Sequence, residues 1–446
     1  MRIPALATKF VNDTSASYWF VPSCMVLCAV ILSFIAEQID VWFSASDLAG
    51  YLPLVDTQPT GARAILSTIA GSIIGVAGVT FSVAMVAVSF ASANFGPRLI
   101  GNFMRDRGNQ LTLGVFIGTF VYALLILRTV RASDESVDAF VPHFSVLVAV
   151  VLALASVGML IYYIHHVPET INVGNIAAGL GRDLHHGINE LFPDRDELLD
   201  ATAAYGWVET ADENAATKIH STISGYIQTL DEAQLSDFAD ENDLKIIVRH
   251  VPGNFVTPAD NVMSVWGDKQ LDDAAIGNLL DTFALGDERT KYQNVAFVAE
   301  QLVEIIARAM SPGINDPYTA VTCLNWLRSG LEDFAFKESQ SLQPEGNERV
   351  FVQPMSFVTL LSLICGGARQ HVAQNGMVTL HMLSVLESVA AALPIGPRLD
   401  AVLDEYSRLY LSSQTVLNDP SEIEAIKARK SEYDKKLKSK GLGGTP

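Results

Sequence analysis

The segment Ala307–Ala320, ARAMSPGINDPYTA, gathers polar and turn-forming residues between two apolar runs. Its candidate functional residues are Ser311, Pro312, Gly313, Asn315, Asp316 and Pro317. We expect mainly a structural corner, in which Pro312 ends one helix and Gly313 supplies the left-handed turn of a C-terminal cap. Asp316 then caps a second helix that begins at Pro317. The alternative is a loop that presents its polar groups to a neighbouring subunit or a bound ion.

Two pairs of adjacent histidines, His165–His166 and His185–His186, are the other side chains that could ligate a metal. Adjacent residues on a helix point about 100° apart, so one pair rarely chelates a metal by itself. We therefore expect surface and interfacial histidines, with neither a metal site nor a cofactor. The four cysteines show no metal-site or disulfide spacing, which predicts buried structural thiols. They are Cys24, Cys28, Cys323 and Cys365.

The chain carries no sequence motif of a hydrolase, a zinc protease or a nucleotide-binding enzyme. We therefore expect a protein without enzymatic activity. Residues 1–164 hold 8 basic and 9 acidic residues, a net charge of −1, whereas the remaining 22 basic and 40 acidic residues give −18. Nucleic-acid binding requires a basic surface, so this balance excludes it.

The apolar residues concentrate before about residue 165, in four segments of bilayer length. These are Tyr18–Ala36, Ala64–Ser92, Leu111–Leu127 and Phe144–Ile164. The sequence predicts a mainly α fold in which four transmembrane helices precede a cytoplasmic α+β region. That region is expected to combine a small β-barrel- or sandwich-like module with a helical bundle.

The loop between the second and third spans is the most basic one, with Arg98, Arg105 and Arg107. Basic loops remain on the cytoplasmic side, which predicts cytoplasmic N- and C-termini in a bacterial inner membrane. The predicted organisation is 1–17 an N-terminal segment, 18–164 the transmembrane domain, 165–205 a helical linker, 206–268 the β module, 269–440 a cytoplasmic helical domain and 441–446 a flexible tail.

The second span is unusually long and rich in small residues. It runs for about 29 residues without a charge, or roughly 43 Å, and so exceeds the hydrocarbon core of about 30 Å. Its candidate pore-lining or helix-packing residues are Gly71, Gly75, Gly78, Ser82, Ser89 and Ser92. Small side chains allow close helix packing, within one bundle or between subunits, and they would equally leave room for a pore. Gly114 and Gly118 form a second GxxxG pair in the third span.

Residues 206–268 alternate between apolar and polar side chains, which predicts short strands. The S-G-Y-I string at Ser224–Ile227 and the G-N-F-V string at Gly253–Val256 resemble the barrel-sandwich pattern of biotinyl-type modules. The lysine that would carry biotin or lipoate has no counterpart in a tight turn here. The resemblance therefore implies a small β module for packing or assembly, and no covalently bound carrier group.

Two long strings and the S-G-Y-I string resemble the domain-of-unknown-function 2254 family of predicted prokaryotic membrane proteins. The long strings are GVAGVTFSVAMVAVSFASANFGPRLIGNFMRDRGNQ and ERTKYQNVAFVAEQLVEIIARAMSPGINDPYTA, and the resemblance covers nearly the whole chain. It implies a bacterial inner-membrane protein and no particular mechanism. The family tends to have R-T-x-x-Q-D, whereas this chain has Arg289, Thr290, Gln293 and Asn294.

Two functional hypotheses follow. The first is a homo-oligomeric, channel-like protein in which the second span lines a pore. Arg98, Arg105 and Arg107 would form a basic inner mouth that attracts anions or lipid head groups, and the acidic half would form a vestibule. The alternative is a membrane-anchored sensory or scaffold protein without a pore. Expected partners are membrane lipid, further copies of the chain and ions.

Overall fold

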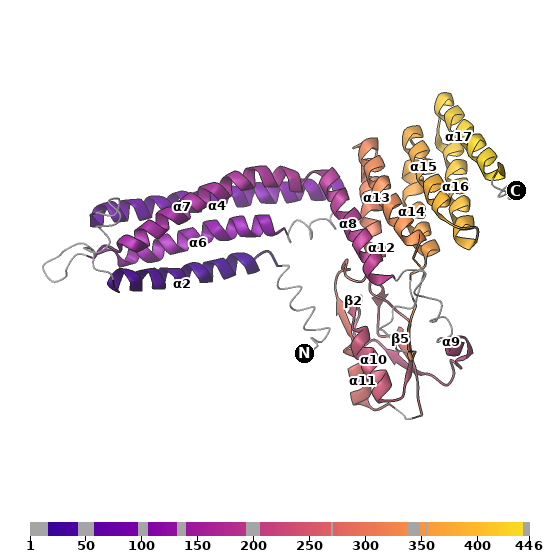
Figure 1. The fold of residues 1–446 in the computed structure, drawn as a ribbon, viewed down its shortest axis with the longest axis horizontal. Helices are drawn as coiled ribbons and strands as arrows, with labels where there is room; N and C mark the ends of the chain where they lie inside the picture. Colours follow the sequence, from indigo (N-terminus) through magenta and orange to yellow (C-terminus); the bar gives the residue numbers. More distant parts are fainter. Residues whose placement is uncertain are drawn as a thin grey trace. The chain divides into compact units, whose positions relative to one another are not determined.

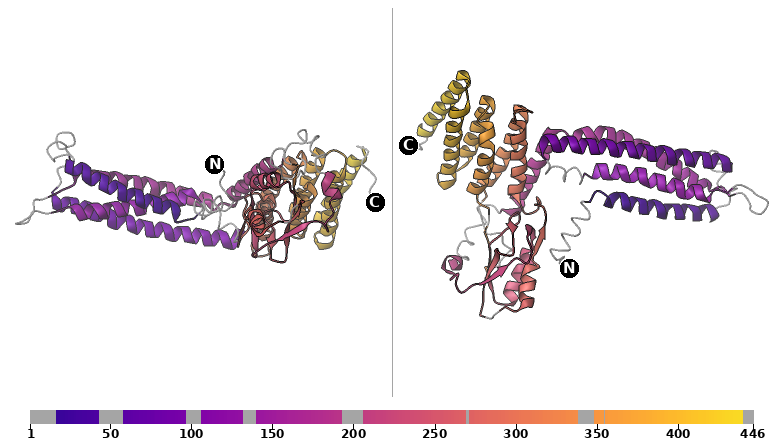
Figure 2. Two further views of the ribbon diagram at one scale, coloured as in Figure 1. Left: turned by 90° about the horizontal axis from the view of Figure 1, so that it is seen from below. Right: turned by 180° about the vertical axis from the view of Figure 1, so that it is seen from behind.

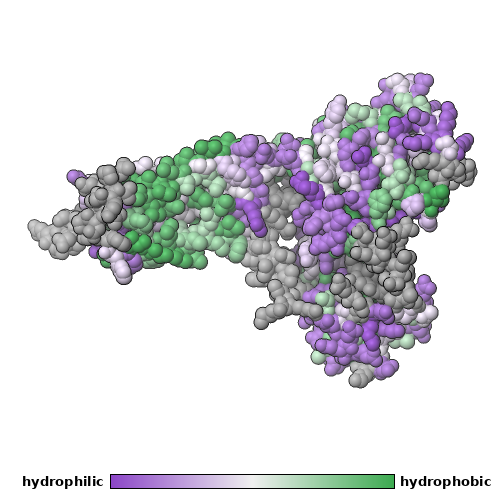
Figure 3. Space-filling model, in the orientation of Figure 1, coloured by the Kyte–Doolittle hydropathy of each residue, from purple (hydrophilic) through white to green (hydrophobic). Residues whose placement is uncertain are grey.

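A computed structural model describes residues 17–42, 58–96, 106–131, 140–192, 206–268, 271–337, 348–353 and 355–439. These residues are mainly helical, as predicted, and the chain forms two compact units. We call residues 12–93 and 97–172 the membrane unit, and the second unit, chiefly residues 173–446, the C-terminal unit. Figure 3 shows hydrophobic residues gathered over the helices of the membrane unit.

The membrane unit contains four helices that are long and apolar enough to cross a bilayer, which confirms the four predicted spans. They are α2 (Phe20–Trp42), α4 (Pro59–Phe95), α6 (Arg107–Thr129) and α7 (His143–Thr170). Helix α2 packs mainly on α6, and α7 packs on both of them. Leu66 of α4, Tyr122 and Ile126 of α6, and Ala149 of α7 meet in a shared core.

Helices α4 and α7 are longer than a bilayer requires. With 37 and 28 residues they measure roughly 55 and 42 Å, against about 30 Å of hydrocarbon. The two helices run side by side beyond the ends of α2 and α6 (Figures 1 and 2). Ala84 and Ala87 of α4 pack against Tyr163 and Val167 near the end of α7. The second span is therefore overlong, as its sequence predicts.

The β module of the C-terminal unit contains two sheets, which do not close into a barrel in the described residues. The strands are β1 (Thr217–His220), β2 (Gly225–Leu230), β3 (Lys245–Val248), β4 (Phe255–Val256), β5 (Asn261–Trp266), β6 (Phe283–Gly286) and β7 (Val350–Val352). Their orders are β1-β5-β3-β7 and β4-β2-β6, and only the β3–β7 pair is parallel. Gly225 pairs with Val256, so the S-G-Y-I and G-N-F-V strings are neighbours.

Three short helices accompany the sheets: α9 (Gly206–Thr210), α10 (Glu232–Glu241) and α11 (Asp273–Leu280). The carboxylates of Asp231 and Asp272 cap α10 and α11 by accepting a bond from a backbone N–H three residues later. Strands β6 and β7 lie beyond residue 269, in the range for which the sequence pattern indicates helices. They complete the two sheets because their apolar residues join the same core.

The remaining helices form a two-layer stack. They are α8 (Val173–Leu191), α12 (Val295–Ala309), α13 (Pro317–Ala335), α14 (Phe357–Val372), α15 (Gly376–Ala392), α16 (Pro397–Val416) and α17 (Pro420–Ser439). Helix α12 packs on α14 and α14 on α16, while α13 packs on α15 and α15 on α17. Figure 1 shows α13 to α17 following one another along this stack. The apolar faces of successive helix pairs therefore bury each other, as in helical repeat proteins.

Candidate functional site

Five of the six small residues singled out on α4 form one stripe on an open face. At 100° per residue, positions 71, 75, 78, 82 and 89 fall within a sector of about 60°. All five are exposed, whereas Ala70, Ile73, Ala77 and Ala84 on the opposite side of α4 are buried. Ser92 is half-buried and lies outside this sector. We call residues Gly71, Gly75, Gly78, Ser82 and Ser89 the α4 stripe.

The two GxxxG pairs of the chain have different surroundings. A Cβ atom added at Gly71, Gly75 or Gly78 would meet nothing within 4 Å in the described part of the chain. A Cβ atom at Gly114 of α6 would collide with the Met25 side chain of α2. The pair in α6 therefore serves helix packing within the membrane unit, while the pair in α4 has no packing role there.

Bulky apolar side chains flank the α4 stripe. The exposed ones are Ile65, Ile74, Val79, Phe81, Val83, Val86 and Phe90. Their exposed fractions lie between 36% and 67%, which suits contact with lipid or with another apolar helix. Between Arg63 and Asn94, α4 has no charged residue. The helix thus presents a narrow groove of small side chains between two apolar borders.

Two polar contacts fix the orientation of α4 against its neighbours. The hydroxyl of Tyr163 on α7 donates to the carbonyl oxygen of Thr80 at 2.6 Å, within a buried environment. Nη2 of Arg63, near the start of α4, donates to the carbonyl oxygen of Val130 at 2.8 Å. The two contacts lie 17 residues apart on α4. They hold α4 against its neighbours, because its small side chains alone would interlock only weakly with the adjacent helices.

The beginning of α7 is capped from another helix. One carboxylate oxygen of Asp40, near the end of α2, accepts the backbone N–H of Phe144 at 2.7 Å. The other accepts the backbone N–H of Ser145 at 2.9 Å and its hydroxyl at 2.5 Å. The sequence does not predict this role, because Pro142, the residue that precedes α7, offers no capping side chain and Asp40 lies about 100 residues away in the chain.

Only one of the three predicted inner-mouth arginines lies in the described residues. Arg107 is the exposed first residue of α6, whereas Arg98 and Arg105 lie outside the described residues. The carboxylate of Asp106 caps α6 by accepting the backbone N–H of Asn109 at 2.8 Å. A carboxylate therefore stands beside the described arginine at this end of the membrane unit.

The histidines pair with four different carboxylates. Nε2 of His166 lies 2.8 Å from Asp106, and its ring stacks on Tyr162. His165 faces Glu169 one turn later on the same helix. In the C-terminal unit, His185 lies 2.5 Å from Asp333, and His186 faces Glu190. Among the described residues no three His, Cys, Asp or Glu side chains gather as a metal site.

The cysteines divide between the two units. Cys24 and Cys28 are exposed on α2, so the prediction of buried thiols is wrong for this pair. Cys323 and Cys365 are buried in the helical stack. Burial, with a smaller contribution from the Asp316 carboxylate, raises the pKa of Cys323 to about 12. Burial also raises the pKa of Cys365, so both buried thiols remain protonated and unreactive.

The SPGINDP corner is held together mainly by its own backbone. Asn315 has a left-handed φ of +47°, whereas Gly313 does not. The expectation that Gly313 supplies this turn is therefore wrong, because asparagine also tolerates the left-handed region. The amide of Asn315 donates to the Ser311 carbonyl at 2.9 Å, and the amide of Asp316 donates to the Ala309 carbonyl at 2.7 Å.

The second half of the corner follows the prediction. Asp316 caps α13 by accepting the backbone N–H of Thr319 at 3.1 Å and its hydroxyl at 2.6 Å. Pro317 is the first residue of α13. Ile314 and Tyr318 are 41% and 74% exposed. The corner thus orients two apolar side chains outward, and contact with another subunit stays a prediction.

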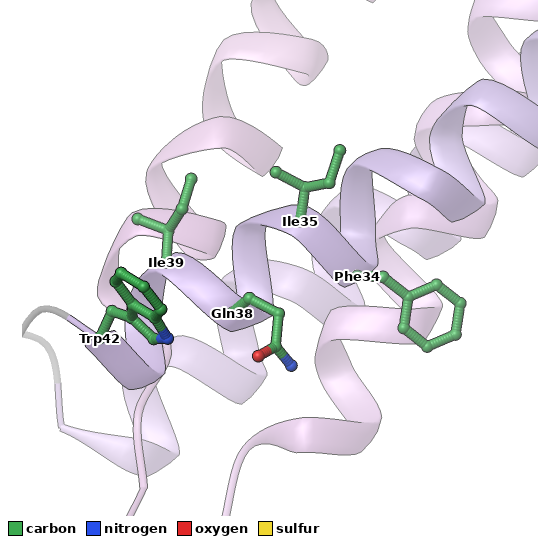
Figure 4. A pocket seen from close by; sticks show the side chains of 5 residues that line it. All are labelled: Phe34, Ile35, Gln38, Ile39 and Trp42. Carbon is green, nitrogen blue, oxygen red and sulfur yellow. The ribbon is translucent and has the colours of Figure 1, made fainter.

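A shallow pocket of about 330 Å³ lies on the outer face of α2. Figure 4 shows its lining residues, Phe34, Ile35, Gln38, Ile39 and Trp42, along one helix. Its polar groups are the Gln38 carboxamide and the Trp42 indole N–H. A groove on one membrane helix that is lined mainly by apolar side chains suits an apolar chain.

The comparison with family models decides the classification. The model of the family described as "Predicted membrane protein (DUF2254)" matches residues 15–388. This chain belongs to the DUF2254 family. The match includes the membrane unit, the β module, the SPGINDP corner and the helical stack as far as α15.

Two mycobacterial relatives of this DUF2254 protein are described as uncharacterized proteins. An uncharacterized protein of Mycobacterium tuberculosis strain CDC 1551 is 28% identical over 373 residues, which cover 82% of this chain and 70% of the relative. An uncharacterized protein of Mycobacterium bovis is 27% identical over 373 residues with the same coverage. No solved structure matches the chain.

The departure from the family string R-T-x-x-Q-D lies at a structural junction. Asn294 caps α12 by accepting the backbone N–H of Phe297 at 3.0 Å, as an aspartate would. Asn294 is 5% exposed, and a Cβ atom at Gly253 would collide with its amide. The substitution of aspartate by asparagine therefore preserves the cap.

The other residues of this string join α12 to strand β2. Gln293 accepts the backbone N–H of Leu230 at 3.0 Å and donates to its carbonyl oxygen at 3.1 Å. Arg289 pairs with Glu300 of α12 at 2.5 Å. The sequence does not predict this junction, because the strand and the helix that it connects are about 60 residues apart in the chain.

Proposed function

We propose that this DUF2254 protein is a homo-oligomeric, channel-like membrane protein in which α4 of each subunit faces a shared axis. The observation that carries the proposal is the position of the α4 stripe on the face opposite to the packed one. Small residues on an unpacked membrane helix are typical of helix–helix contacts between subunits. The Ser82 and Ser89 hydroxyls would keep the axis wettable.

A passive pathway fits α4 better than an ion-coupled pump. Pumps place an ionisable residue in the membrane interior as a relay, and the stretch between Arg63 and Asn94 has none. We place the protein in the bacterial inner membrane with both termini in the cytoplasm, because the loop with Arg98, Arg105 and Arg107 is basic. Its proposed partners are lipids, ions and further copies of the chain, and we propose no catalytic activity.

The test compares leucine substitutions at two open glycines. Gly75 lies in the α4 stripe, whereas Gly158 lies on α7, where an added Cβ atom would also meet nothing within 4 Å in the described residues. Gly75→Leu should shift the detergent-solubilised protein from oligomer to monomer and abolish its conductance in planar bilayers. Gly158→Leu should preserve both. A monomeric wild-type protein, or an oligomer unaffected by Gly75→Leu, would refute the proposal.

A second candidate function is a membrane-anchored scaffold without a pore. It is supported by the two-layer helical stack, since such stacks present extended surfaces to protein partners. The exposed Ile314 and Tyr318 at the corner offer one apolar contact point. A photo-crosslinker at Tyr318 of the full-length protein should then capture one defined partner in cells. The same crosslinker at exposed Leu411 of α16 is the matched control.

A further inference from the structure

One ionisable pair joins the start of α6 to the last turns of α7. Nε2 of His166 lies 2.8 Å from Oδ1 of Asp106, and the two side chains expose only 19% and 23% of their surface. The neighbouring pair of His165 and Glu169 has the same chemistry but exposes 81% and 56%. Partial burial strengthens a charge pair, because water screens it less. Of these two pairs, Asp106–His166 therefore responds more strongly to protonation of its imidazole.

The carboxylate oxygen that faces His166 also caps α6. Oδ1 of Asp106 accepts the backbone N–H of Asn109 at 2.8 Å. The backbone carbonyl oxygen of Asp106 accepts the N–H of Gln110 at 3.2 Å. Both contacts satisfy N–H groups that the first turn of a helix leaves without an intrahelical partner. A side chain that holds Asp106 in place therefore also orders the first turn of α6.

Gly108 of α6 makes room for the pair. A Cβ atom at this position would collide with the His166 ring and with the Tyr162 hydroxyl. The His166 ring stacks on the Tyr162 ring, with the centroids 4.9 Å apart and the planes 18° apart. The stacked tyrosine and the bare glycine together fix the position of the imidazole beside Asp106.

The pair has few other ionisable neighbours among the described residues. Helix α4 has no ionisable side chain after Arg63. Tyr18, which precedes α2, interacts electrostatically with Asp106, and the adjacent Arg107 is exposed. The remaining ionisable neighbours belong to α7 and are Tyr162, Tyr163, His165 and Glu169. Asp106 is therefore the carboxylate that balances a charge on His166.

We propose that Asp106 and His166 form a pH-sensitive latch between α6 and α7. Histidine side chains change charge between about pH 5 and pH 8, where carboxylates are already ionised. A protonated His166 adds an ion pair to the hydrogen bond with Asp106, whereas a neutral imidazole retains only the hydrogen bond. The proton comes from solvent, to which both side chains are partly exposed. The latch is therefore closed in acid and loosens as the pH rises.

The latch reaches α4 through the adjacent face of α7. Tyr163 and Val167 each follow a residue of the stacked pair, and they pack on Ala84 and Ala87 of α4. The Tyr163 hydroxyl also donates to the carbonyl oxygen of Thr80 at 2.6 Å. One region of α7 thus contacts α4 and the start of α6, so a loosened latch should change the current through the α4 pathway. This regulatory role rests on the proposed function, whereas the latch itself does not.

Hydrogen exchange of the full-length protein in detergent tests the latch at about pH 6 and about pH 8. Protection factors correct each rate for the intrinsic effect of pH. The backbone amides of Asn109 and Gln110 should be about fivefold more protected at the lower pH in the wild type. His166→Gln retains a hydrogen-bond donor that does not titrate, so this difference should vanish. His165→Gln removes the exposed imidazole, and as the matched control it should retain the difference.

A second variant displaces the imidazole without removing it. Gly108→Ala places a methyl group against the ring of His166, so the two amides should be weakly protected at both pH values. Equal protection of the wild type at both pH values, or an unchanged pH difference in the His166→Gln protein, would overturn the latch.

Currents in planar bilayers test the regulatory role separately. The wild-type current should differ between the two pH values, and the current of the His166→Gln protein should not. A pH-dependent protection with a pH-independent current would overturn the regulatory role alone. A wild-type protein without any current would refute the proposed pathway, and the exchange data would still decide on the latch.

Discussion

The cap that Asp40 provides for α7 yields a prediction that the geometry makes quantitative. Asp40→Ala removes the acceptor for two backbone N–H groups, those of Phe144 and Ser145, and for the Ser145 hydroxyl. Pro142 at the N-cap position of α7 makes no side-chain cap. No other capping group among the described residues bonds these two N–H groups, so the first turn of α7 should open locally.

The expected magnitude has two parts. Loss of a capping side chain costs about 1 kcal/mol. Loss of a carboxylate at a helix N-terminus costs up to about 1–2 kcal/mol in a partly buried site. Asp40→Ala should therefore destabilise the first turn of α7 by about 2–3 kcal/mol. Asp40→Asn retains an acceptor oxygen and loses only the charge, so about 1 kcal/mol is expected.

Hydrogen exchange measures this effect directly. The backbone amides of Phe144 and Ser145 should exchange about 30-fold faster or more in the Asp40→Ala protein. A loss of 2 kcal/mol raises the equilibrium constant for local opening by about this factor. Glu37→Ala, three residues earlier on α2, is the control for charge loss, because no hydrogen bond of its carboxylate is found in the described structure. Equal exchange in Asp40→Ala and Glu37→Ala proteins would refute the cap.

Three further predictions concern the C-terminal unit. Asn315→Ala should lower the free energy of unfolding of this unit by about 1 kcal/mol, because alanine disfavours the left-handed φ of +47°. Gly313→Ala should leave the free energy of unfolding nearly unchanged, and chemical denaturation of both proteins measures the difference. Gly253→Ala should cost about 1–3 kcal/mol, because φ is +98° and the new methyl group would meet Asn294; a melting temperature equal to that of the wild type would contradict this. Burial, and to a smaller extent Asp231, raises the pKa of Glu232 from 4.5 to about 7. The folded state then binds the extra proton, so its stability should fall as pH rises from about 4.5 to 7, and Glu232→Gln should remove that slope.

Local structure was predictable where its cause is local. Asp316 caps α13 and Pro317 is its first residue, as predicted, because a capping side-chain oxygen needs only the backbone three residues ahead. The sequence predicts Gly313 as the left-handed residue of the corner, whereas Asn315 takes that conformation in the structure. Both residue types tolerate that conformation, so the spacing of the surrounding backbone hydrogen bonds decides between them.

Pairings between distant segments could not be predicted. Strand β7 pairs with β3, although Val350 and Ile246 are about 100 residues apart. The Gln293 side chain bonds the backbone of Leu230, and no periodicity in the sequence marks that contact. Such contacts depend on how the helices between them pack, which one stretch of sequence does not specify.

The sequence by itself determined that the chain has four segments long and apolar enough to cross a membrane and that the second of them is overlong, because length and apolarity are properties of each segment alone. It also showed that α4 is rich in glycine and serine. Only the tertiary structure decided which face of α4 packs, which left Gly71, Gly75 and Gly78 open while Gly114 meets Met25. The physical reason is that small side chains permit close packing on any face. The choice of face then rests on contacts from other helices, such as the hydrogen bond from Tyr163 to Thr80.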